Sequence, residues 1–79
     1  MKYGFLELKD DLTIGHEVEF FYMKNKYSIS NNAEGCYLTK YGEEEYQSFN
    51  DYEELLENAV IDNKTLEEIW DNVIVECVF

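Results

Sequence analysis

The chain begins with apolar residues spaced as they are on one face of a helix. Phe5, Leu8 and Leu12 recur at intervals of three and four residues, with charged residues between them. Such spacing places the three side chains on one side of an α-helix. Gly15 lies just beyond this pattern and is a suitable terminator. We therefore predict a short amphipathic helix over residues 4–12.

The pattern changes to a period of two over residues 17–30, where aromatic and β-branched residues alternate with other residues. This alternation is typical of a half-buried strand, and we predict a β-hairpin. Lys24-Asn25 is the predicted two-residue turn, because asparagine tolerates a positive φ. In that register Tyr22 faces Tyr27 and Phe20 faces Ile29. One face of the hairpin then carries Val18, Phe20, Tyr22, Tyr27 and Ile29.

Two more strands and a terminal strand follow from the same alternation. A turn cluster at 31–35 precedes a strand over 36–41, and an acidic loop precedes a strand over 45–49. Residues 73–79 are again rich in β-branched and aromatic residues, and they predict a final strand.

Two helices are predicted between the fourth and the final strand. Asn50 with Glu53 has the spacing of a capping box, which predicts a helix over 51–59 with Tyr52, Leu55, Leu56 and Ala59 facing inward. Thr65 with Glu68 forms a second capping box after a turn at 62–64, and it opens a short helix that buries Leu66, Ile69 and Trp70.

The predicted order of elements is therefore α-β-β-β-β-α-α-β. It indicates a small α+β fold with a mainly antiparallel sheet of four to five strands and short helices packed on one face. A chain of 79 residues has room for one core, so residues 1–79 are expected to form a single domain. The hydrophobic content of 46% is enough to exclude disorder caused by a lack of apolar material.

The net charge restricts the possible binding partners more than any other feature of the composition. Eighteen acidic residues stand against six basic ones, all of them lysine, and the formal net charge is -12. Nucleic-acid binding depends on lysine and arginine that neutralise phosphates, so direct binding to DNA or RNA is excluded. An anionic membrane surface is excluded for the same reason. The expected partner is a basic protein.

The cysteines and the first residues indicate a compartment. Cys36 and Cys77 are too few for a disulfide framework, and acidic residues occupy the place of the apolar core of a signal peptide. No apolar run approaches the length of a membrane span. We therefore expect a cytoplasmic protein in which both thiols are reduced and buried.

No motif predicts catalysis, a cofactor or a metal. His16 is the single histidine, and it is interpreted as a surface residue at the entry to a strand. Cys36 has no nearby base in the sequence, and neither cysteine has the companion ligands that a zinc site needs. The four glycines are scattered, which leaves no phosphate-binding loop. The expected class is a non-enzymatic binding protein.

A binding face can be proposed from the strand alternation. If the inward residues of the hairpin face the helices, the opposite face carries an apolar centre, formed by Phe21, Met23, Tyr37 and Tyr41. Acids around such a centre would form the charged rim of a protein-binding patch. The predicted rim consists of Glu17, Glu19, Glu43, Glu44, Glu45, Glu53, Glu54 and Glu57. Two alternatives stay open: the first helix covers this face as a second core, or the acids are ordinary solvated surface.

In size and charge alone, the chain is similar to acidic phage inhibitors of restriction and CRISPR systems. This predicts an inhibitor that mimics nucleic acid and blocks a basic, nucleic-acid-handling protein. The alternatives are an immunity protein or antitoxin that neutralises a basic nuclease toxin, and an acidic accessory domain.

Overall fold

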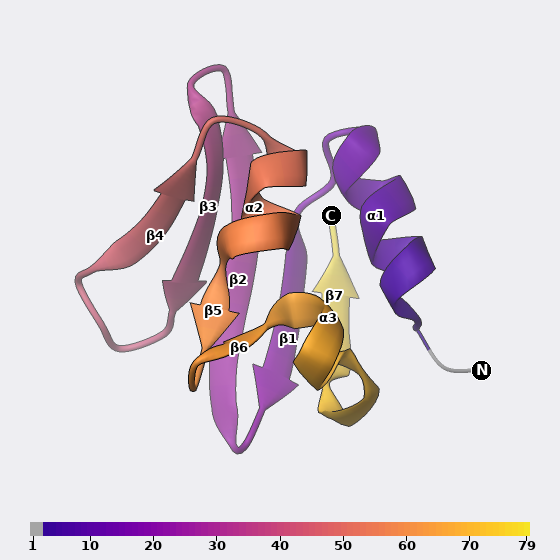
Figure 1. Cartoon of the computed structure of the whole chain (residues 1–79), viewed down its shortest axis with the longest axis vertical. Helices are drawn as coiled ribbons and strands as arrows, with labels where there is room; N and C mark the ends of the chain where they lie inside the picture. The colour runs from indigo at the N-terminus through magenta and orange to yellow at the C-terminus, as the bar shows by residue number, and fades with distance from the viewer. Residues whose placement is uncertain (1–2) are drawn as a thin grey trace.

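The computed structural model describes residues 3–79 and shows three short helices against one five-stranded sheet (Figure 1). The helical segments are α1 (Phe5–Thr13), α2 (Tyr52–Asn58), α3 (Leu66–Ile69) and the 3-10 turn η1 (Trp70–Asn72). The strands are β1 (Val18–Tyr22), β2 (Asn25–Asn32), β3 (Gly35–Lys40), β4 (Tyr46–Phe49), β5 (Val60–Ile61), β6 (Lys64–Thr65) and β7 (Ile74–Val78). The α+β fold and the predicted order α-β-β-β-β-α-α-β are confirmed.

The large sheet has the strand order β4-β3-β2-β1-β7, and each neighbouring pair is antiparallel. The first four strands follow one another along the chain as a meander. The last strand returns after the helices and pairs with β1, which places β4 and β7 at the two edges. A register shift between Glu19 and Phe20 interrupts the pairing of β1 with β7.

All helical segments contribute to a single core on one face of the sheet. Leu8 and Leu12 come from α1, and Trp70 of η1 packs edge-on against Phe20 of β1 with 5.3 Å between ring centroids. The indole nitrogen of Trp70 donates a hydrogen bond to the carbonyl of Tyr3 at 3.0 Å. The full set of buried core residues is Leu8, Leu12, Val18, Phe20, Tyr22, Tyr27, Ile29, Cys36, Leu38, Leu55, Leu56, Ala59, Ile61, Leu66, Ile69 and Trp70.

The hairpin turn lies one residue earlier than the sequence predicts. Met23 and Lys24 form the turn with φ angles of 51° and 68°, and Asn25 is the first residue of β2. The observed register pairs Tyr22 with Asn25 and Phe20 with Tyr27, so the predicted pairs are wrong by two positions. Asn25 acts from outside the turn, since its side-chain amide donates to the carbonyl of Met23 at 3.3 Å. The predicted inward face of the hairpin is nevertheless the buried one.

The cap of α2 also differs from the prediction. The N-cap is Asp51 rather than Asn50, and its carboxylate accepts a hydrogen bond from the backbone N–H of Glu54 at 2.8 Å. A carboxylate is favoured here because it faces the positive end of the helix dipole. Asn50 instead donates its side-chain amide to the carboxylate of Glu54 at 3.1 Å. The capping box of Thr65 and Glu68 on α3 is present as predicted.

A two-stranded sheet of β5 and β6 lies between α2 and α3 and is absent from the sequence prediction. Its turn residues, Asp62 and Asn63, have φ angles of 54° and 65°. These strands have two residues each, which is too short for an alternating pattern to be visible. Among residues 3–79, no helix has the length and apolar character needed to span a membrane.

Both cysteines are free thiols, in environments that differ from each other. Cys36 is buried in the core, as predicted. Cys77 is only half-buried, which corrects the expectation that both thiols are buried. It lies opposite Glu19 in the pairing of β7 with β1, on the side of the sheet away from the core.

Candidate protein-binding surface

One face of the sheet has no helix over it within residues 3–79, because every helical segment packs on the other side. We call it the open face. The alternative in which α1 covers this face as a second core is therefore ruled out, because α1 joins the core that α2 and α3 share. The open face carries Glu19 and Phe21 of β1, Lys26 of β2, Tyr37 of β3, and Tyr41, which follows β3.

Lys26 is the centre of a compact polar network on this face. Its ammonium nitrogen lies 2.7 Å from a carboxylate oxygen of Glu76 and 3.3 Å from one of Glu19. The same nitrogen sits 4.8 Å from the ring centroid of Tyr41 and 5.8 Å from that of Phe21. The hydroxyl of Tyr41 donates to the other carboxylate oxygen of Glu19 at 2.7 Å. Four strands or strand ends thereby meet around one cation.

The network changes the proton affinities of its members. The hydrogen bonds to Glu76 and Glu19 raise the pKa of Lys26, so this lysine stays charged. The hydrogen bond from Tyr41, followed by the contact with Lys26, lowers the pKa of Glu19. The same bond raises the pKa of Tyr41. Glu19 therefore already interacts with Lys26 and Tyr41, and its negative charge is not free to pair with a basic partner.

A second cluster lies where the open face reaches the β4 edge. The rings of Tyr37 and Tyr46 meet edge-on at 79° with centroids 5.6 Å apart, and Tyr46 is 60% exposed. The hydroxyl of Tyr37 donates to the side-chain oxygen of Asn32 at 3.1 Å, which fixes the ring. These tyrosines line a hollow of about 350 Å³, which we call the outer hollow, together with Glu34, Ser48, Phe49, Asn50 and Glu54. The outer hollow brings together two predicted site residues, Tyr37 and Glu54.

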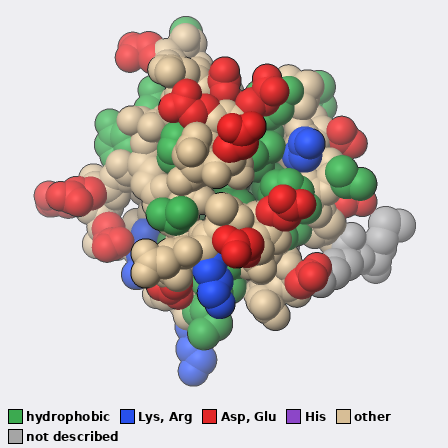
Figure 2. All heavy atoms as spheres, in the orientation of Figure 1, with side chains coloured by type: hydrophobic (Ala, Val, Ile, Leu, Met, Phe, Trp, Pro, Cys, Tyr) green, Lys and Arg blue, Asp and Glu red, His purple; other side chains and the backbone are tan. Residues whose placement is uncertain are grey.

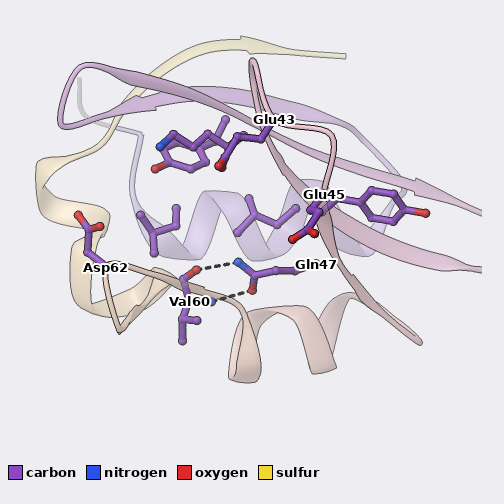
Figure 3. A pocket seen from close by; sticks show the side chains of 10 residues that line it. Glu43, Glu45, Gln47, Val60 and Asp62 are labelled. Atoms are coloured by element: carbon purple, nitrogen blue, oxygen red, sulfur yellow. Dashed lines mark hydrogen bonds between the residues drawn. The ribbon is translucent and has the colours of Figure 1, made fainter.

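The acidic loop between β3 and β4 borders another hollow, on the core side of the same edge strand. Figure 3 shows Glu43, Glu45 and Asp62 around it, and its volume is about 340 Å³. We call it the inner hollow. The side chain of Gln47 closes one side by pairing with both backbone groups of Val60, at 2.8 Å to its oxygen and 3.0 Å from its nitrogen (Figure 3). Glu44 is exposed but does not line this hollow.

The acids of α2 lie apart from the aromatic centre. Glu53 and Glu57 line a hollow on the helix side with Phe5, Lys9 and Glu67. Figure 2 shows this helix-covered side, where red acidic side chains gather in the upper part of the view. The predicted rim is therefore split between two faces: of the α2 acids, Glu54 alone also borders a hollow that reaches the open face.

Met23 does not belong to the apolar centre in the predicted way. It forms the hairpin turn and is 66% exposed, instead of pointing outward from a strand. Sequence reasoning missed Lys26, Glu76 and Tyr46. The alternation within β4 would have placed Tyr46 on the outward side, whereas the pairing of Lys26 with Glu76 depends on the long-range contact of β7 with its sheet.

Three possible metal ligands meet on the open face. Ligand atoms of Glu19, Glu76 and Cys77 all lie within 4.8 Å of one another. The ammonium group of Lys26 already supplies a positive charge to both carboxylates. Lys26 thus supplies the positive charge that a metal ion would otherwise provide to these carboxylates.

Outside these residues, the described ion pairs add only His16 with Asp11. Glu43, Glu44, Glu45, Glu53 and Glu57 are exposed and have no ion pair with another residue of the range 3–79.

In comparisons with protein families, curated proteins and solved structures, the chain matches none of them.

Proposed function

We propose that the protein is a non-enzymatic inhibitor that binds a basic, nucleic-acid-handling protein in the cytoplasm. One observation carries the proposal: exposed carboxylates that have no cationic partner within residues 3–79 flank a strand edge that also presents tyrosine rings. The loop before β4 supplies Glu43, Glu44 and Glu45, whereas Glu53 and Glu57 of α2 add to the net charge from the helix side. Carboxylates on a rigid scaffold can occupy the positions of phosphates on such a partner, and their field speeds association.

The tyrosine rings supply an apolar contact area that the carboxylates lack. Tyrosine is enriched at the energetic centres of protein interfaces, where it combines a large apolar area with a polar tip. Tyr46 is exposed and its ring is supported by Tyr37, so it costs little conformational entropy on binding. Charge therefore steers the partner, and the tyrosines hold it.

The experiment uses the wild-type chain as bait beside a variant with Glu43, Glu44 and Glu45 changed to Lys. We expect capture of a basic nucleic-acid-handling protein at about 50 mM salt, loss of capture at about 500 mM, and release of the partner by added DNA or RNA. The triple variant should associate more slowly. Capture that is unaffected by salt and by the triple substitution would contradict the proposal. Micromolar binding of the chain itself to nucleic acid would also contradict it.

The identity of the captured protein separates this role from the alternative. A nuclease toxin encoded beside this chain would identify an immunity protein or antitoxin, which acts through the same electrostatics. A nucleic-acid-binding effector of a defence system would identify an inhibitor of that system.

A further inference from the structure

We propose that the free edge of β4 accepts an extended basic segment of the partner as a sixth strand of the sheet. The inference deepens the proposed function and rests on it, since it names the part of the partner that binds and the way it binds. Within residues 3–79, β4 is the terminal strand of the sheet and pairs only with β3. Alternate residues of such a strand direct their N–H and C=O groups away from the sheet, where another strand can pair with them.

The sequence of β4 leaves this edge without the usual protection. Proteins block exposed edges with lysine, proline, a bulge or a covering element. The strand reads Tyr46-Gln47-Ser48-Phe49, with no charge and no proline, and its pairing with β3 is regular. Figure 1 shows β4 at the left margin of the sheet, with no labelled element beyond it. Within the strand itself, the short length of about 13 Å is the protective feature.

Charge decides what can pair there. The strand is preceded by Glu43, Glu44 and Glu45 and followed by Asp51, Glu53 and Glu54. A second copy of this chain would bring acidic ends against acidic ends in either strand direction, which costs free energy. A lysine- or arginine-rich segment would meet opposite charge at both ends. The same acids thus oppose self-association and favour a basic strand.

The hollows on the two sides of β4 determine where the side chains of the added segment would lie. Side chains of a strand alternate between faces, so consecutive residues of the added segment would point to opposite sides of the sheet. One side has the outer hollow, with the tyrosine pair and Glu54. The other side has the inner hollow, where the acids Glu43, Glu45 and Asp62 outnumber one cation, Lys40. Consecutive cationic residues therefore fit better than alternating ones.

Arginine suits the outer hollow better than lysine. Its planar group stacks on tyrosine rings and forms paired hydrogen bonds with a carboxylate. Tyr46 is exposed there, and Asn50 holds the carboxylate of Glu54 by a hydrogen bond of 3.1 Å. We therefore expect the segment to carry an arginine at this position.

The test uses a capped hexapeptide with a central run of arginines as the probe. A matched control has the same sequence with every backbone nitrogen methylated, which keeps the charge but removes the N–H groups of both edges, so that it cannot pair as a strand. Amide hydrogen exchange of Tyr46–Phe49 is measured by NMR with each peptide. We expect the first peptide to slow exchange in β4 at least tenfold and the methylated peptide to have no such effect. Equal protection by both peptides, or none by either, would overturn the proposal.

Two charge variants complete the design. Changing Glu45 and Glu54 to Lys should weaken peptide binding at least tenfold, while changing Glu57 and Glu67 to Lys, with the same change in net charge, should weaken it less than about threefold. Equal weakening by both pairs would mean that net charge alone attracts the peptide, and it would refute strand pairing. Protection of β4 that rises with protein concentration in the absence of peptide would instead identify a second copy as the occupant.

These results are independent of the test of the proposed function. A captured partner that nucleic acid displaces, but that leaves β4 exchange unchanged, would preserve the inhibitor role and refute strand addition. Protection of β4 by the peptide, with no basic nucleic-acid-handling partner captured, would support strand addition and contradict the inhibitor role.

Discussion

Replacing Gly35 with alanine should destabilise the sheet where β3 meets β4. Gly35 has a φ of +158°, and a Cβ atom built on it would lie 2.2 Å from the carbonyl oxygen of Phe49. That oxygen belongs to the backbone of β4, so no side-chain rotation can relieve the contact. Either β4 moves away at this end or Gly35 changes its backbone conformation. Both responses disturb the pairing of Cys36 with Phe49.

A second glycine provides the matched control. Gly42 also has a positive φ, +90°, but a Cβ atom there would have nothing within 4 Å. Gly42→Ala should therefore cost only the backbone penalty, about 1–2 kcal/mol. Gly35→Ala should add the cost of forcing atoms into a packed site, about 1–3 kcal/mol. The difference between the two variants isolates the collision with Phe49 from the general loss of a glycine.

The free energy of unfolding is measured by urea denaturation and the midpoint by thermal melting. For a domain of this size, 1 kcal/mol corresponds to about 4–8 °C in Tm, so the Gly35 variant should melt at least about 4 °C below the Gly42 variant. A chain of 79 residues is expected to have about 4–12 kcal/mol of total stability. The summed cost of about 2–5 kcal/mol for Gly35→Ala lies below most of this range, so both variants are compared at a temperature where each is folded. Equal destabilisation by the two substitutions would refute the reasoning and the close approach of β3 to β4.

Three further predictions concern caps, pH and thiols. Thr65→Ala removes the capping-box hydroxyl of α3 and should cost about 1 kcal/mol in urea denaturation; no change would mean that the cap is not formed. The hydrogen bond from Tyr3 lowers the pKa of Asp11, so its stabilisation is present above the unfolded-state pKa of about 3.9 and is lost as the pH falls through the lower folded-state value. Asp11→Asn should therefore destabilise at about pH 6 and become neutral near about pH 2, and a pH-independent effect would contradict this. Cys77 should react with a thiol reagent in the native state faster than Cys36, which is buried and whose pKa burial raises; equal rates would contradict the two environments.

The predicted faces of the strands were confirmed even where the predicted register was wrong. Moving the hairpin turn from Lys24-Asn25 to Met23-Lys24 shifts the pairing by two residues. Because side chains alternate with a period of two, this shift leaves the residues that stay in β1 and β2 on their predicted faces, while Met23 moves into the turn. The local pattern therefore predicts the inward face well. It predicts the turn poorly, because two non-glycine residues adopt positive φ angles there.

The candidate site was predictable only as far as it depends on single strands. Alternation placed Phe21 and Tyr37 on the outward side. It could not show that Glu53 and Glu57 would lie on the helix side, because that depends on how α2 packs across β3 and β4. Nor could it show that Glu19 would be engaged with Lys26, since this contact requires the register of β1 and β2.

The dimensions of the molecule limit which acids can act together. Its extents are 30 × 27 × 21 Å, and Figure 1 is viewed along the shortest, with the helices in front of the sheet. The Debye length is about 8 Å at physiological ionic strength and about 30 Å at 0.01 M, so charges on opposite faces cooperate only at low salt. Changing Glu53 and Glu57 to Lys should therefore slow association at a β4 interface at about 0.01 M salt and have little effect at about 0.15 M. Changing Glu43 and Glu45, which border that strand, to Lys should slow association at both salt concentrations. At about 0.15 M, an equal effect of the two changes would mean that net charge alone attracts the partner, and a larger effect of the Glu53 and Glu57 change would place the partner on the helix side instead.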